Sequence, residues 1–247
     1  MPAAVPFWKR PLDVALVLLS VPLFLPLALA ITLGILVVSP GPIFYTQERI
    51  GHRGRRFKCW KFRSMKVDSG KNDAVHQSHT TELMRKGEPW MKLDKHDPRV
   101  IPLGRLLRAT GLDELPQLYN ILRGDMSVVG PRPCTPYEFD QYLPWQKERL
   151  ACLPGLTGLW QVSGKNHTTF VEMVCLDIQY ARQPSLVRDL KIIFQTIPTL
   201  LEQVSGVIQK PIGKRKQQQQ RHDAGFSANG EATRIAALQT DHEVIRK

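Results

Sequence analysis

The sequence has no charged residue between Val14 and Gln47. Within this stretch, Val14–Val38 is almost continuously apolar and exceeds the roughly 20 helical residues that cross a bilayer. A cleavable signal peptide fits badly, because the apolar run is too long and no clear small-residue cleavage site follows it. The absence of charge therefore predicts a helix that stays in a membrane.

Cysteine is also scarce, and its residues form no CxxC pair, which argues against a metal site and a disulfide framework. The four cysteines are Cys59, Cys134, Cys152 and Cys175. We expect reduced thiols in a protein that faces a cytoplasm. His76, His79 and His96 match no metal motif, so the polar stretch 68–96 predicts a solvated loop.

Basic residues flank the apolar run on both sides. The 247-residue chain has a formal net charge of +12, which favours nucleic acid, an acidic membrane surface or phosphorylated substrates as partners. Lys9 and Arg10 precede the run, and no acidic residue interrupts the cations between Arg49 and Lys66. Because basic flanks resist translocation, a helix that enters the membrane and returns places both ends on the cytoplasmic side.

Two prolines in the middle of the run support this re-entrant geometry. Pro22 and Pro26 each remove a helical hydrogen bond and push the chain off its axis. A limb from Asp13 to Pro26 rises about 20 Å at 1.5 Å per residue. That is short of a hydrocarbon core of roughly 30 Å, so we favour a re-entrant helix over a full span.

The chain then divides into three parts. We predict a re-entrant membrane helix-hairpin over residues 9–40, a cytoplasmic catalytic domain over 41–206, and a polar, disordered tail over 207–247. A short strand is expected at Ile43–Tyr45. The predicted fold class is α+β and mainly helical: a single small cytoplasmic domain with the re-entrant helix and with amphipathic helices at the membrane interface.

Two apolar stripes at helical spacing predict amphipathic helices. The first consists of Leu115, Leu118, Tyr119 and Leu122. Pro116 is tolerated in the first turn of this helix, and Gly124 ends it. The second stripe consists of Leu186, Leu190, Ile193, Ile197 and Leu200. It fits a helix packed on the core and a helix lying in the membrane interface equally well.

Arginines gather in the block Asp97–Pro133, and their planar forks of donors suit phosphate oxygens. They are Arg99, Arg105, Arg108, Arg123 and Arg132. Prolines on both sides of Arg132 stiffen its backbone and limit the entropy lost when it binds a ligand.

Asp113 and Glu114 lie in the same block, at the expected start of a helix. Acidic residues there are ordinary capping residues, and this interpretation stays open. Alternatively, a diphosphate substrate needs a divalent cation, and the cation needs carboxylates. A carboxylate can also attack phosphorus and form an acyl phosphate. Adjacent helical residues diverge by about 100°, so the two acids can have different roles.

The chain resembles the bacterial sugar transferase family, the monotopic polyprenyl-phosphate phosphoglycosyl transferases. Six segments carry the resemblance in the family's order: KRPLDVAL at Lys9–Leu16, SPGPIFYTQERIG at Ser39–Gly51, KFRSM at Lys61–Met65, the Asp97–Pro133 block, PGLTGLWQVSGK at Pro154–Lys165 and LDIQYARQPSLVRDLKI at Leu176–Ile192. Six collinear motifs are far more specific than any one of them.

The resemblance implies an activity. The enzyme would transfer a sugar 1-phosphate from a UDP-sugar to polyprenyl (undecaprenyl) phosphate, giving polyprenyl-diphosphate-sugar and UMP. Asp113 would attack the β-phosphate in a ping-pong reaction, and Glu114, with Asp113, would hold Mg²⁺ or Mn²⁺. This reaction is the first membrane step in the assembly of exopolysaccharide, lipopolysaccharide or other glycoconjugates.

The resemblance also implies substrate contacts. Arg108 and Arg132 match arginines of the family pattern. Further substrate-binding candidates are Lys61, Arg63, Arg99, Arg105 and Gln161. Two positions depart from the family: Leu25 replaces the serine that usually precedes the helix-breaking proline, and Lys165 stands where arginine is common.

The implied partners are a UDP-sugar, polyprenyl phosphate and membrane lipid, without nucleic acid, and a homodimer stays an open alternative. The implied location is the bacterial inner membrane, with the catalytic domain facing the cytoplasm. The competing hypothesis is a non-catalytic, membrane-anchored scaffold or binding protein that uses its basic face.

Overall fold

A computed structural model describes residues 5–66, 78, 80–84, 99–164 and 168–208. These residues belong to one compact unit that is mostly helical, with two small sheets. The polar tail from residue 209 onward and the three histidines discussed above lie outside the described residues. The elements in chain order are α1 (Lys9–Val38), β1 (Phe44–Ile50), η1 (His52–Gly54), β2 (Arg56–Phe62), α3 (Pro102–Thr110), η2 (Leu112–Glu114), α4 (Gln117–Arg123), β3 (Ser127–Val129), α5 (Pro136–Asp140), η3 (Pro144–Ala151), β4 (Gly155–Thr157), α6 (Leu159–Val162), α7 (Phe170–Arg182) and α8 (Leu186–Ile208).

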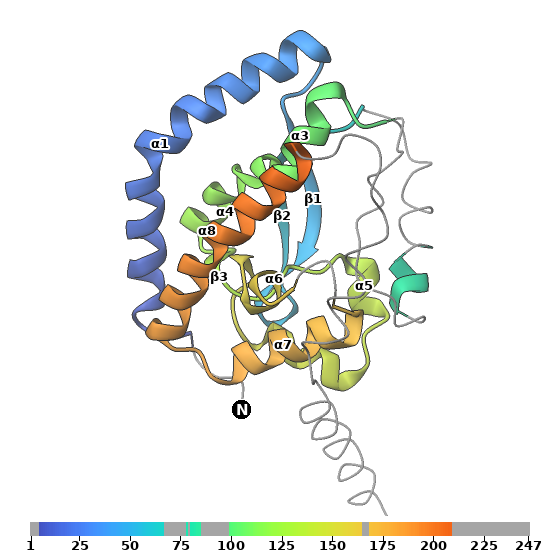
Figure 1. Cartoon of the computed structure of the whole chain (residues 1–247). Coiled ribbons are helices and arrows are strands. Elements are labelled where there is room, and N and C mark those ends of the chain that lie inside the picture. Colours follow the sequence, from blue (N-terminus) through green and yellow to red (C-terminus); the bar gives the residue numbers. More distant parts are fainter. Residues whose placement is uncertain (1–4, 67–77, 79, 85–98, 165–167, 209–247) are drawn as a thin grey trace, which may run out of the picture. The chain divides into compact units, whose positions relative to one another are not determined.

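The apolar run forms one continuous helix, α1, which contains both Pro22 and Pro26. Figure 1 shows that the helix bends midway along its length. The bend agrees with the hydrogen bonds that the prolines remove, although the helix continues through them and makes no tight turn back. Among the described residues, α1 alone is long and apolar enough to cross a membrane. Its re-entrant insertion stays a prediction.

The two ends of α1 pack on the rest of the protein, whereas its middle is exposed. Val17 packs with Ile121 and Met126, while Ile31 and Ile35 belong to a second buried cluster. Large apolar side chains between these anchors are exposed: Leu18, Leu19, Val21, Leu23, Leu25 and Leu29. The middle of α1 therefore presents apolar surface that no other described part of the protein covers.

The cations before the apolar run have structural partners. Lys9 is buried and donates hydrogen bonds to the Val129 carbonyl and to Asp189. Arg10 donates to the carbonyls of Ile121 and Leu122 at the end of α4. Carbonyls at a helix C-terminus have no intrahelical donors, so a guanidinium satisfies them well. Lys9 is thus part of a buried ion pair and not of an exposed basic flank.

The strand expected at Ile43–Tyr45 is longer than predicted, because β1 pairs with β2 in an antiparallel hairpin from Phe44↔Phe62 to Ile50↔Arg56. β2 was not predicted, since its cations obscured a period of two. Phe57 and Cys59 point inward, while Arg56 and Lys58 are exposed. The alternation of aromatic residues and cations in this segment therefore reflects the buried and exposed faces of a strand.

The second sheet pairs β3 with β4 in parallel, with Ser127 opposite Gly155. It requires close backbone contact, since a Cβ atom at Gly130 would lie 2.2 Å from the Leu153 carbonyl oxygen. Only glycine allows this approach. The contact fixes the backbone immediately before Arg132.

The helix predicted around the first stripe is present as α4, and Gly124 ends it with φ = 84°. Only part of the stripe packs inward: Leu115 and Leu118 pack against buried clusters, whereas Tyr119 and Leu122 are 51% and 40% exposed. Asn120 is fully buried instead, where it accepts a hydrogen bond from the Trp60 amide and donates to the Lys58 carbonyl. α4 uses this polar face because the edge of β2 needs hydrogen-bond partners.

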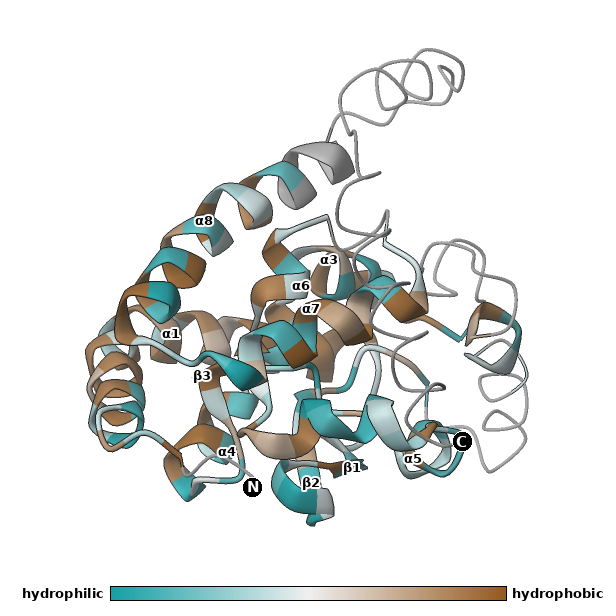
Figure 2. Ribbon diagram, turned by 90° about the horizontal axis from the view of Figure 1, so that it is seen from below, coloured by the Kyte–Doolittle hydropathy of each residue, from teal (hydrophilic) through white to brown (hydrophobic). Residues whose placement is uncertain are grey.

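The second stripe forms part of α8, and most of it is exposed. The buried side chains of α8 are Asp189 and Ile192, which lie outside the stripe. Four of the five stripe residues are exposed, namely Leu186, Leu190, Ile197 and Leu200. Figure 2 shows hydrophobic residues along both α1 and α8. Ile193 packs against a buried cluster, whereas the other four stripe residues do not, and this exposure favours the interfacial interpretation for most of the stripe.

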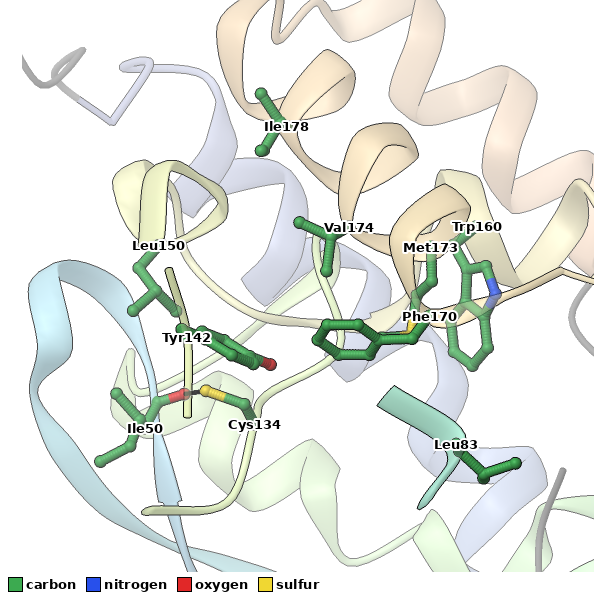
Figure 3. Close-up of a cluster of buried hydrophobic side chains, with 10 residues drawn as sticks. All are labelled: Ile50, Leu83, Cys134, Tyr142, Leu150, Trp160, Phe170, Met173, Val174 and Ile178. Atoms are coloured by element: carbon green, nitrogen blue, oxygen red, sulfur yellow. Dashed lines mark hydrogen bonds between the residues drawn. The ribbon is translucent and has the colours of Figure 1, made fainter. Parts of the chain in front are cut away.

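The largest buried cluster contains Ile50, the last residue of β1, together with residues of α7. Figure 3 shows Tyr142, Phe170 and Trp160 within it, together with Ile50, whose carbonyl accepts a hydrogen bond from the Cys134 thiol. Leu83 also belongs to this cluster, so the segment expected to be a solvated loop contains a core residue. All four cysteines are free, as predicted.

Candidate active site

The Asp113–Glu114 dyad lies in a short 3₁₀ turn, η2, between α3 and α4. Gly111 ends α3 with φ = 75°, a conformation that favours glycine, and leads directly into this turn. Pro116 precedes α4 as its N-cap and does not lie in its first turn. The acids are therefore displaced from the α4 N-terminus, and a tight connection holds them.

The two acids differ in exposure. Asp113 is buried, at 3% exposure, whereas the side chain of Glu114 is 24% exposed. Glu114 accepts a 2.7 Å hydrogen bond from the Lys61 ammonium, which comes from the end of β2. A desolvated carboxylate beside a more accessible one fits two distinct roles.

Arg132 lies in the segment after β3, and a carboxylate orients its guanidinium. It forms a 3.3 Å ion pair with Glu138. Glu138 is itself buried and locked in a capping box at the start of α5: its side chain accepts from the Thr135 amide, and its own amide donates to the Thr135 hydroxyl. Burial disfavours the charged form of Glu138, but Arg132 and Arg49 outweigh this effect and lower its pKa.

A second arginine supports the backbone of Arg132. Arg149 donates a 3.0 Å hydrogen bond to the Arg132 carbonyl and a 2.7 Å bond to the Tyr142 hydroxyl. It also forms a fully buried ion pair with Asp177. Arg132 is thus held at its carbonyl and at its guanidinium, which limits the entropy that a bound phosphate must remove.

Arg49 also belongs to this charged group. From the sequence it was expected only as one of the basic residues that flank the apolar run. It is buried and donates to the Pro133 carbonyl. Burial lowers its pKa, and the nearby charge of Arg132 lowers it further. The carboxylates of Glu138 and Glu114 act in the opposite direction. Arg49 and Arg132 therefore share an electrostatic environment with Glu138, and Glu114 has a smaller effect on both arginines.

Sequence reasoning missed Glu138 as well as Arg49. The pattern Thr135-Pro136-Tyr137-Glu138 is a capping-box signature and could have identified Glu138. For Arg49 the local sequence carries no comparable signal, because its burial depends on the hairpin and on Cys134, which pairs with Ile50.

Three further candidates are arginines that precede the dyad in the sequence. Arg108 is in the last turn of α3, with its guanidinium 3.5 Å from the Ser64 hydroxyl, and Arg105 on the same helix is exposed. Arg99 is partly buried, and its carbonyl accepts from the Lys66 amide. Their substrate contacts stay predictions.

Two further candidates have structural hydrogen bonds. Arg63 is buried and donates to the carbonyls of Ser39 and Pro40, so it holds the exit from α1. Gln161 in α6 donates to the Leu156 carbonyl at 3.1 Å. These bonds account for part of each side chain, because Arg63 Nε and Gln161 Oε1 are buried without a hydrogen-bond partner. Their roles toward a substrate stay predictions.

The dyad fits a magnesium site of a particular kind. Among the described residues, no group of three or more His, Cys, Asp or Glu side chains comes close enough to hold a metal by itself. Mg²⁺ usually takes one or two carboxylates and completes its shell with water and substrate phosphates. The two adjacent carboxylates match that donor set, with most of the shell left to a diphosphate.

The chain is similar to known proteins over most of its length. A family model described as bacterial sugar transferase matches residues 4–203. The exopolysaccharide production protein ExoY of Rhizobium meliloti is 43% identical over 194 residues, which cover 78% of this chain and 84% of ExoY. A UDP-glucose:undecaprenyl-phosphate glucose-1-phosphate transferase of Caulobacter vibrioides is 42% identical over 206 residues, or 80% of this chain and 71% of the relative.

A further relative is longer than this chain. The galactosyl transferase CpsE of Streptococcus agalactiae is 46% identical over 164 residues, which cover 65% of this chain. The chain matches 35% of CpsE but most of ExoY. The family match covers α1, the dyad and the arginine block together, and the chain belongs to the bacterial sugar transferase family.

Proposed function

We propose that this protein transfers a sugar 1-phosphate from a UDP-sugar to polyprenyl phosphate and releases UMP. The observation that carries the proposal is the buried Asp113 next to Glu114, which accepts a hydrogen bond from Lys61. The names of relatives as undecaprenyl-phosphate galactose and glucose-1-phosphate transferases support the same reaction class.

In the first step, a carboxylate oxygen of Asp113 attacks the β-phosphorus of the UDP-sugar. A bond from aspartate oxygen to phosphorus forms, the bond from phosphorus to the bridging oxygen breaks, and UMP leaves with the electron pair. Burial of Asp113 removes water that would otherwise solvate the nucleophile and hydrolyse the intermediate.

In the second step, a phosphate oxygen of polyprenyl phosphate attacks the same phosphorus. Asp113 leaves as a carboxylate, and the product is polyprenyl-diphosphate-sugar. Arg132, held by Glu138, and Lys61 place positive charge beside the phosphates in both steps. Magnesium or manganese bound by the dyad would add charge neutralisation at the diphosphate.

The membrane placement follows from the exposed apolar surfaces. The middle of α1 and most of the stripe on α8 are apolar and exposed. We infer that α1 enters the inner membrane and returns, and that α8 lies in the interface with the catalytic residues on the cytoplasmic side. A lipid phosphate then meets the site at headgroup depth.

The test is UMP release from a panel of UDP-sugars that includes UDP-galactose and UDP-glucose, with Asp113→Asn as the variant. The exposed Asp140→Asn is the matched control. We expect Asp113→Asn to lose at least about 10³-fold in rate, as removal of a nucleophile does, and Asp140→Asn to keep full activity. Full activity in Asp113→Asn would overturn the assignment of the nucleophile.

A second measurement tests the covalent route. Intact-protein mass spectrometry, with the donor present and the lipid acceptor absent, should show a mass increase of one sugar phosphate in the unmodified enzyme. The Asp113→Asn variant should show none. No adduct with a donor that supports turnover would overturn the ping-pong route.

A further inference from the structure

The Lys61–Glu114 pair has properties that suggest a control of metal binding. Lys61 is the second-last residue of β2, and Glu114 lies in η2, 53 positions later in the chain. The two groups lie 2.7 Å apart and are 20% and 24% exposed. Partial exposure lets each partner exchange for another ligand without the cost of a fully buried, uncompensated charge.

The pair places a cation on the acid that the proposed function assigns to the metal. Lys61 donates to Oε1 of Glu114. A divalent cation bound by the same carboxylate would lie a few ångströms from the ammonium, and charges of like sign at that distance repel each other strongly. Lys61 and the metal therefore compete for Glu114.

A diphosphate changes this competition. Its oxygens offer Lys61 another anionic partner, and the flexible four-carbon stem of lysine lets the ammonium reach it. Because no larger cluster of acids was found among the described residues, the metal also gains most of its remaining ligands from the same phosphates. One ligand thus releases the lysine and completes the metal shell.

We propose that Lys61 guards Glu114 against free divalent cations and releases it when a nucleoside diphosphate binds. The inference rests on the proposed function. In the free protein the ammonium neutralises the carboxylate, and the metal binds together with the diphosphate. Lys61 thereby couples metal binding to substrate binding.

The primary experiment measures Mn²⁺ binding to the full chain in lipid nanodiscs, without nucleotide, from the electron paramagnetic resonance signal of free Mn²⁺. Removing the competing ammonium in Lys61→Met should tighten Mn²⁺ binding about tenfold, which is the effect of one charge-assisted hydrogen bond. Lys61→Arg keeps the competing charge and should stay close to the unmodified protein. Lys58→Met, an exposed lysine on the same strand, should leave Mn²⁺ affinity unchanged.

A double variant locates the effect. The tighter binding of Lys61→Met should disappear when Glu114→Gln is added, because the metal then lacks its carboxylate. An unchanged or weaker Mn²⁺ affinity in Lys61→Met, with an unfolding midpoint equal to that of Lys58→Met, would overturn the proposal. So would a gain that survives Glu114→Gln.

The nucleotide arm tests the coupling with UDP as the diphosphate. Mn²⁺ should strengthen UDP binding in the unmodified protein. In Lys61→Met this enhancement should be smaller by a factor of about three or more. An equal enhancement in both proteins would contradict the release step. Mn²⁺ and UDP binding are read without turnover, so failure here leaves the Asp113-dependent release of UMP as a separate question.

Discussion

Two lysine–carboxylate pairs of almost equal length have different surroundings. Lys9 and Asp189 lie 2.6 Å apart at the base of α1, with side chains 4% and 1% exposed. Lys61 and Glu114 lie 2.7 Å apart in the candidate active site, at 20% and 24% exposure. Distance alone does not distinguish them, so burial and additional partners decide what each pair does.

The pair at the base of α1 is saturated with hydrogen bonds. Lys9 also donates to the Val129 carbonyl and the Tyr180 hydroxyl, and Tyr180 donates to Asp189. Removing one member leaves a buried charge that water cannot reach. The active-site pair is open enough for water and ligands to replace either partner, which suits a site that must bind and release a substrate.

The largest expected effect comes from Asp189→Asn. It leaves the buried Lys9 ammonium without its counter-charge and should cost about 3–5 kcal/mol in the free energy of unfolding. The thermal midpoint should fall by roughly 10 °C, measured by circular dichroism. Asp140→Asn on the surface is the control. A double change of Lys9 to Met and Asp189 to Leu should recover much of the loss, and a single variant that keeps the full midpoint would contradict this role.

The Arg132–Glu138 pair is the intermediate case, with side chains 27% and 4% exposed. Glu138→Gln should cost about 2 kcal/mol, the contribution of a hydrogen bond between charged groups, and should raise the KM for the UDP-sugar. Asp140→Asn, on the same helix, again serves as the control. Unchanged KM and stability in Glu138→Gln would show that Glu138 does not hold Arg132 in place.

The pH dependence of this pair has a defined sign. The pKa of Glu138 is below its ordinary value of 4.5, so its charge stabilises the fold fully above that value. The stability difference between the unmodified protein and Glu138→Gln should be constant from pH 7 to about 5.5. It should shrink as pH falls below 4.5 toward the lowered pKa. A difference that shrinks already near neutral pH would contradict the lowered pKa.

Lys61→Met should have a smaller effect on stability, in spite of the short distance. We expect a loss of less than about 1 kcal/mol, because both partners reach water when separated. The measurement is chemical denaturation beside Lys58→Met. A loss as large as that of Asp189→Asn would show that the two pairs contribute equally to the free energy of unfolding, which would contradict the effect of exposure.

The smallest effect is expected at the exposed pair of Arg182 and Glu148, which are 2.6 Å apart and 63% and 47% exposed. Glu148→Gln should change the free energy of unfolding by no more than about 0.5 kcal/mol. High salt should abolish even that difference. A larger loss, unaffected by salt, would mean that exposure is a poor guide to these pairs.

Some elements were predictable because their signals are local. The uncharged apolar run predicted α1, and Pro22 and Pro26 predicted a break where the helix bends. The spacing before Gly124 predicted α4 and its end. The dyad and the arginine block pointed to phosphate chemistry, since guanidiniums match phosphate oxygens and carboxylates hold the cation that a diphosphate needs.

Other features were not predictable because they depend on partners far along the chain. α4 buries Asn120 and exposes Tyr119, since the edge of β2 supplies polar partners 60 residues away. Arg49 joins the site only after the hairpin forms and Ile50 pairs with Cys134. Burial of a polar residue is favourable only where a hydrogen-bond partner is present, and local periodicity contains no information about that partner.

By itself the sequence predicted the long apolar helix, the mainly helical α+β class and the Asp113–Glu114 dyad within an arginine-rich block. It did not predict β2, or the places of Arg49 and Glu138. Tertiary structure decided which charges are structural and which stay exchangeable. Lys9 meets Asp189 across 180 positions and is buried, whereas Lys61 meets Glu114 at a surface that ligands can reach. The reason is that the strength of an ion pair depends on how much water surrounds it, which only the packed structure sets.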